Sequence, residues 1–134
     1  MFDLESMDYA ALFADSFKGW QDSQAAIRSM ADSARKRKIP ALVVIFPSFQ
    51  GNMDDHFYSY LEAHEKIKSV ARENRLPVFD LRPVYAKINP RGNAWWAIPV
   101  DMHPGVEGHR IAGKAIAAEL LREGLMPKTG KSRL

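Results

Sequence analysis

The sequence predicts an α/β domain in which helices and parallel strands alternate along the chain. Two stretches with helical spacing of apolar residues are each followed by a short apolar run, and a third helical stretch closes the pattern. The chain has 134 residues and no cysteine. This length allows one domain, 1–134, and the lack of cysteine excludes disulfide scaffolds and cysteine-bound metals.

The first predicted helix covers 20–38 and is followed by the clearest strand. Apolar residues recur at helical spacing from Trp20, and the basic run 35–38 suits the negative end of the helix dipole. Pro40 ends this helix. The run 41–46 is continuously apolar and rich in β-branched residues, which is typical of a strand covered on both faces in a parallel sheet.

A second helical pattern extends from Phe57 to Asn74, with Asp54 or Asp55 as the expected N-cap. Small and apolar residues mark a last helix, which Gly124 ends. The remaining predicted elements are a strand over 78–81, a Pro/Gly/Asn-bearing loop over 82–101, the last helix over 105–123 and a flexible tail over 126–134.

Only two strands are predicted, whereas open parallel sheets usually have about four to six. Apolar residues in the segment 1–19 have nearly helical spacing, so they do not supply another strand. We therefore expect an incomplete sheet in which the strand over 41–46 has an unpaired edge, and self-association through that edge follows as a prediction.

Asp101 and His103 are the candidate catalytic residues. In an extended segment, residues two apart point to the same side, so the carboxylate can hold one ring nitrogen and leave the other free to accept a proton. Pro104 suits the first turn of the following helix. The alternative from spacing alone is that Asp101 is a turn residue and His103 a solvated loop side chain.

The block Asp-x-His-Pro, followed by x-x-x-Gly-His and a helix of small apolar residues, resembles the last conserved block of the SGNH hydrolases, also called the GDSL lipase/esterase family. The resemblance covers 20–125. It implies a three-layer α/β/α, flavodoxin-like fold and hydrolysis of a small ester through a serine. Asp101 would orient His103, which would act as general base and then acid.

The family's Gly-Asp-Ser nucleophile block and its Gly and Asn oxyanion blocks are not found in the chain. Ser16 in Ala-Asp-Ser-Phe is a weak match, placed too close to the strand over 41–46. Asn52 follows the wrong strand and is expected to form a turn. The chain therefore resembles the C-terminal half of the family's domain, and we expect little or no activity from it alone.

Five other residues have competing interpretations. His109 shares a helical stripe with Gly113, so it is expected to be buried against the sheet. Trp95 and Trp96 either wall an acyl pocket or cover the end of the sheet. A metal at His56 and His64 is disfavoured because they lie two helical turns apart, and no metal or cofactor is predicted.

Charge and hydropathy exclude several classes of partner. The formal net charge is only +3, and aromatic residues do not interleave the Lys/Arg clusters, so no nucleic-acid partner is predicted. No apolar run approaches the roughly 20 residues of a membrane span. Residues 1–19 lack a signal-peptide pattern, which leaves the cell compartment undetermined. The functional alternatives are thus a serine ester hydrolase and an inactive fragment or interaction module that pairs with a missing half.

Overall fold

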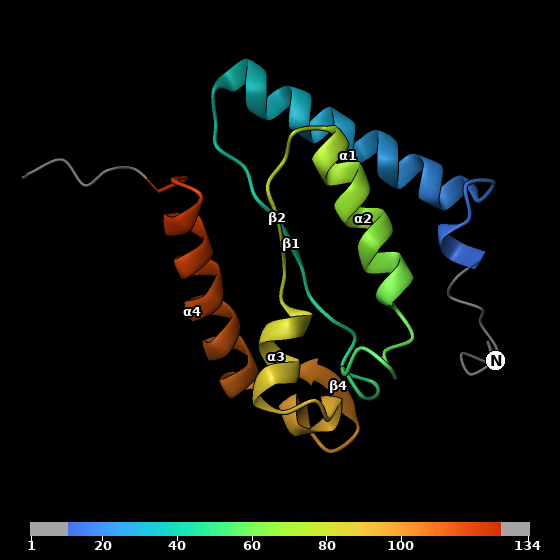
Figure 1. Ribbon diagram of the computed structural model, residues 1–134, viewed down its shortest axis with the longest axis vertical. Helices are drawn as coiled ribbons and strands as arrows, with labels where there is room; N and C mark the ends of the chain where they lie inside the picture. The colour runs from blue at the N-terminus through green and yellow to red at the C-terminus, as the bar shows by residue number, and fades with distance from the viewer. Residues whose placement is uncertain (1–10, 127–134) are drawn as a thin grey trace, which may run out of the picture.

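The computed structural model describes residues 11–126 and shows the general α/β class that the sequence predicts (Figure 1). Residues 127–134 of the predicted tail lie outside the described residues. The first half of the described chain repeats a helix followed by a short strand. These elements are the 3₁₀ helix η2 (Ala11–Phe13), α1 (Lys18–Arg37), β1 (Val43–Ile45), α2 (Leu61–Glu73) and β2 (Val78–Asp80).

The strands β1 and β2 form a parallel pair, with Val44 opposite Phe79. The N–H of Val43 donates to the carbonyl of Pro77, and the carbonyl of Ile45 accepts from Leu81. Because these groups alternate in direction along a strand, the backbone of Val44 faces the other edge of β1. Among residues 11–126, no strand pairs with that edge.

Helices cover both faces of this pair (Figure 1), with α1 and α2 on one side and α4 (Val106–Arg122) on the other. On the α1/α2 side, Val43 and Val78 pack against a buried cluster of Ala31, Ala71 and Leu76. On the other side, the main core packs against Val44 and Phe79 and includes Ile111 and Ala112 of α4. The alternation of β1 and β2 side chains thus places two apolar layers on one small sheet.

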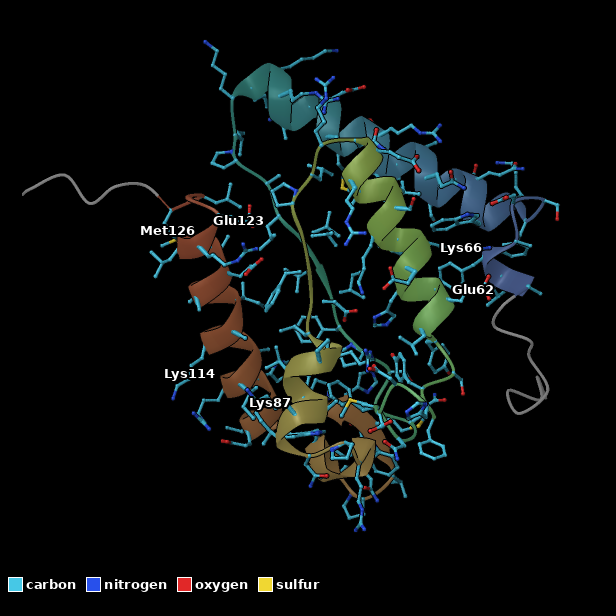
Figure 2. The ribbon with its side chains drawn as sticks, viewed as in Figure 1. Glu62, Lys66, Lys87, Lys114, Glu123 and Met126 are labelled. Atoms are coloured by element: carbon cyan, nitrogen blue, oxygen red, sulfur yellow. The ribbon has the colours of Figure 1, made fainter. Side chains whose placement is uncertain are left out.

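The α2 helix also holds the N-terminal turn. Lys66 forms an ion pair with Glu62 of the preceding helical turn at 3.5 Å, and its Nζ donates to the carbonyl of Phe13 at 2.7 Å. Figure 2 shows both labelled side chains on the flank of α2 that faces η2. The ring of Phe13 packs on Trp20, which is buried at the start of α1.

The predicted start of the second helix is wrong, because α2 begins at Leu61. Asp54 caps a turn: its carboxylate accepts from the N–H of His56, and its carbonyl accepts from Phe57 and Tyr58. Phe57 is 70% exposed and does not belong to the apolar face of α2. Asn52 forms the predicted turn, in which its side-chain oxygen accepts from the N–H of Asp54 at 2.9 Å.

The predicted loop over 82–101 is also wrong, because it contains regular structure. Pro83 occupies the first turn of a short helix, where its missing N–H costs nothing. Tyr85 of that helix is fully buried, and its hydroxyl donates to the carbonyl of Gly108 in α4 at 2.7 Å. The elements in this segment are α3 (Arg82–Ile88), the 3₁₀ helix η3 (Gly92–Trp95) and β3 (Trp96–Ile98).

A hairpin leads into the last helix. The strand β4 (Asp101–Pro104) pairs with β3 in antiparallel fashion, and α4 follows it with Gly105 as N-cap. Pro104 therefore ends β4 and does not begin the helix, which corrects its predicted place. Glu123 and Met126 lie at the far end of α4 from this hairpin (Figure 2). In residues 11–126, no helix combines the length and apolar character that a membrane crossing requires.

Candidate active site

The strand β4 brings together the two candidate catalytic residues. Nδ1 of His103 lies 2.5 Å from Oδ1 of Asp101, and the backbone N–H of His103 donates to the same oxygen at 3.0 Å. The ionised carboxylate can only accept, so Nδ1 carries the proton and Nε2 presents a lone pair. The extended backbone of β4 is what allows this contact between residues two apart.

This pair is open to solvent. The side chain of His103 is 88% exposed and that of Asp101 is 40% exposed. The hydrogen bonds from the His103 side chain and backbone lower the pKa of Asp101 below its usual value, so the carboxylate stays ionised at neutral pH. An oriented imidazole with a free, accessible Nε2 is the arrangement required of a general base.

His103 borders an open pocket of about 460 Å³ between the segment after β1 and the start of α4. The walls combine aromatic and sulfur-containing side chains with a few polar groups, as small-molecule sites do. The segment after β1 contributes one wall, and β4 and α4 contribute the other. The first wall includes Phe46, Ser48, Phe49 and Gln50, and the second wall includes Met102 and His109.

The wall after β1 is held in place by long-range hydrogen bonds. The indole N–H of Trp96 donates to the carbonyl of Phe49 at 2.7 Å, and the backbone N–H of Ser48 donates to the hydroxyl of Tyr58 at 2.7 Å. The ring of Phe49 packs edge-on against Tyr85 in the core. These contacts fix the segment after β1 relative to β3 and α3, so this wall of the pocket is anchored to the rest of the domain.

Gly92 allows the closest backbone approach at this wall. Its N–H donates to the carbonyl of Gly51 at 2.8 Å. A Cβ at this position would lie 2.2 Å from the carbonyl oxygen of Phe49, a separation that no side chain tolerates. Glycine is therefore required where η3 crosses the segment after β1.

Two sequence-based expectations about α4 are wrong. His109 is exposed and borders the pocket with His103, whereas the sequence places it against the sheet. A Cβ on Gly113 would meet nothing within 4 Å, so Gly113 marks no close contact. The buried face of α4 instead carries Gly108, Ile111 and Ala112, about one residue around the helix from the predicted stripe.

Among residues 11–126, no serine hydroxyl forms a hydrogen bond with His103. Ser16 lies in the turn before α1, far from β4 (Figure 1), and does not border the pocket. Ser48 does border it, which local sequence gave no reason to expect. Among the hydrogen bonds of residues 11–126, none joins a hydroxyl to Nε2 of His103.

A second Asp-His pair lies between α2 and β2, where sequence reasoning did not find it. Nδ1 of His64 is 3.0 Å from Oδ2 of Asp80, and both side chains are almost fully buried, at 5% and 6% exposure. Nε2 of His64 meets the hydroxyl of Tyr58 at 3.1 Å. Because that hydroxyl also accepts from Ser48, a chain of hydrogen bonds connects β2 to the pocket wall.

Hydrogen bonds and charges around Asp80 keep its buried carboxylate ionised. Burial alone would raise the pKa of Asp80, but hydrogen bonds from His64 and Lys68 outweigh burial and hold the pKa well below its usual value. Nζ of Lys68 lies 2.9 Å from Oδ2, and the N–H of Arg82 donates to Oδ1 at 3.0 Å. Burial raises the pKa of Tyr58 to about 12, so its hydroxyl keeps the proton that it donates to His64.

Neither tryptophan borders the pocket at His103. Trp95 is buried against Tyr85, and its indole N–H donates to the carbonyl of Asn89. Trp96 supports the pocket through its hydrogen bond to Phe49 and through its pairing with Pro104 across β3 and β4. Trp96 also borders two other cavities. The acyl-wall interpretation therefore does not hold for the pocket at His103. Within the described part of the chain, no three carboxylate or imidazole side chains gather as metal ligands would.

Comparisons with known proteins do not identify the chain. No family model, curated protein or solved structure matches it. The geometry of β4 and the pocket is therefore the basis for assigning a function to the chain.

Proposed function

We propose that the chain carries the Asp-His half of an SGNH-type serine ester hydrolase. The observation that supports this proposal is the 2.5 Å contact between Asp101 and His103, with Nε2 left open beside a pocket. The contact between Nδ1 and the carboxylate favours this proposal over the alternative that Asp101 shapes a turn and His103 is a solvated side chain, because a turn needs only the backbone N–H of His103 as donor. We also propose that the α/β elements form part of the family's three-layer α/β/α fold.

Each residue has a defined role in this reaction. Nε2 of His103 takes the proton of a serine hydroxyl while the serine oxygen attacks the ester carbonyl carbon. The same proton then passes to the departing alkoxide as the carbon–oxygen bond breaks. Asp101 holds His103 in the tautomer with a proton on Nδ1 and stabilises the imidazolium that forms between these steps. A water molecule repeats the sequence on the acyl-serine and releases the carboxylic acid.

The proposal predicts that the 134-residue chain alone hydrolyses esters poorly, because members of a triad act as a unit. Hydrolysis of p-nitrophenyl butyrate should exceed the buffer rate only slightly. Robust hydrolysis that His103→Ala abolishes would contradict this expectation and direct attention to Ser48. Ser48→Ala is the variant that would then decide the nucleophile.

Adding an alcohol tests whether His103 acts as a general base, because the alcohol supplies the hydroxyl that a serine would otherwise provide. Acyl transfer from p-nitrophenyl butyrate to added propanol is measured in the wild type, His103→Ala, Asp101→Asn and the matched control His56→Ala. We expect transfer above background only where the Asp101–His103 pair is intact, because general base catalysis requires the oriented imidazole. Equal transfer by the wild type and His103→Ala would overturn the proposal.

The second candidate function is an interaction module that pairs with a missing half or with itself. The observation that favours it is the edge of β1 that no strand covers among residues 11–126, since uncovered apolar edges recruit other strands. Size-exclusion chromatography tests it directly. Dimers or higher assemblies that dissociate on Val44→Pro support it, whereas a concentration-independent monomer argues against self-association.

A further inference from the structure

The pocket at His103 has two large apolar side chains that remain partly exposed. Phe46, from the segment after β1, is 44% exposed, and Met102 of β4 is 43% exposed. Pro47 and Phe49 extend the same apolar wall. Large apolar groups gathered from two distant segments around one concave site are typical of a ligand that covers them.

The polar groups at this pocket restrict the class of ligand. Among the residues that the structure describes, no lysine or arginine borders it, so this part of the chain gives the pocket no fixed positive charge of the kind that phosphoryl or sulfate groups require. The ionisable groups at its border are the imidazoles of His103 and His109. A ligand with one carbonyl or carboxylate end and an apolar body fits this distribution, and its polar end belongs at the imidazoles.

We propose that this pocket binds the apolar acyl chain of a carboxylic ester, with the carbonyl at His103 and the chain against Phe46 and Met102. This inference rests on the proposed function and adds the substrate class, an acyl group longer than acetyl. The volume of about 460 Å³ lies within the range of small-molecule sites. Phe46 and Met102 are then the residues that determine acyl specificity.

The test uses the free carboxylates that ester hydrolysis would release. Acetate, butyrate and octanoate are titrated into the full chain at constant ionic strength, and NMR follows the imidazole C–H signals and the Met102 methyl signal. We expect saturable shifts for octanoate, weaker binding for butyrate and none for acetate. Each buried methylene should contribute up to about fourfold in affinity.

Variants distinguish specific binding in this pocket from nonspecific hydrophobic binding elsewhere on the surface. Phe46→Ser should weaken octanoate binding about tenfold, since the variant removes one apolar wall, and Phe46→Leu should retain most of it. Phe57→Ser is the matched control, because Phe57 is more exposed but does not border the pocket. Equal weakening by Phe57→Ser, or affinities that do not depend on chain length, would overturn the inference.

The two proposals fail in different ways. If octanoate does not bind but transfer to propanol still requires His103, the acyl pocket is wrong and the proposed function stands. If octanoate binds with the expected chain-length dependence but His103→Ala transfers as well as the wild type, the pocket stands and the catalytic role is wrong. Both readouts come from the same folded chain.

Discussion

Within residues 11–126, a histidine is paired with an aspartate twice, and the two pairs differ in their surroundings. Asp80 and His64 lie buried between β2 and α2, where Tyr58, Lys68 and the backbone occupy their polar atoms. Asp101 and His103 lie on β4 with Nε2 facing an open pocket. Every polar atom of the buried pair has a partner, whereas the pair on β4 leaves one imidazole nitrogen free, and we propose that this difference separates a structural pair from a catalytic one.

Removing the carboxylate from each pair should affect stability very differently. Asp80→Asn removes a buried charge that His64 and Lys68 both contact and leaves Lys68 paired only with the exposed Glu65, so we expect a loss of about 3 kcal/mol in the free energy of unfolding. Asp101→Asn should leave the urea midpoint unchanged because that carboxylate is solvated. Urea unfolding followed by circular dichroism measures both variants. Similar losses of stability in Asp80→Asn and Asp101→Asn would contradict the difference between the buried and the exposed pair.

The pH dependence of stability should come from the buried pair. The folded pKa of Asp80 lies below its unfolded value of about 3.9, so its contribution is complete above that value and is lost as the pH falls through the folded pKa. The stability difference between the wild type and Asp80→Asn should shrink by about 2 kcal/mol between pH 7 and pH 2. Unfolding curves at several pH values check this, and a difference independent of pH would contradict the assignment.

Tyr58 connects the two regions, and removing its hydroxyl should have a smaller effect. Tyr58→Phe leaves the buried N–H of Ser48 and Nε2 of His64 without a partner, which should cost about 1 kcal/mol. The variant should also shift the NMR amide signal of Ser48 and speed its hydrogen exchange, because the pocket wall loses one anchor. Unchanged exchange at Ser48 would show that Trp96 and Gly92 hold the wall without Tyr58.

The sequence predicts best where the signal is local. The apolar run 41–46 contains β1, and the spacing of Asp101 and His103 anticipates their contact. Asp80 and His64 meet across 16 positions and two elements, so no local pattern reveals them. Local sequence likewise does not reveal that Phe46 and Ser48 border the pocket, because they reach it only where the segment after β1 approaches β4 and the start of α4.

Other errors come from weak local signals. The seven-residue α3 contains Pro83, which the sequence analysis treated as a loop signal although proline is common in a first helical turn. On α4, the predicted stripe contained His109 and Gly113, whereas Gly108, Ile111 and Ala112 face inward and the missing side chain of Gly108 allows close contact with Pro104. Glu119 is buried on this helix through its pair with Arg122, a contact that apolar periodicity ignores.

Carbethoxylation of the histidines tests the central claim most directly, because the reagent attacks a neutral imidazole nitrogen that is free and accessible. At about pH 8, above the usual imidazole pKa of about 6.5, mass spectrometry gives the rate at each site. We predict that His103 reacts faster than the other histidines, that His64 is protected, and that Asp101→Asn slows His103 but not His109. A His103 rate no greater than that of His56, or one that Asp101→Asn leaves unchanged, would contradict the account.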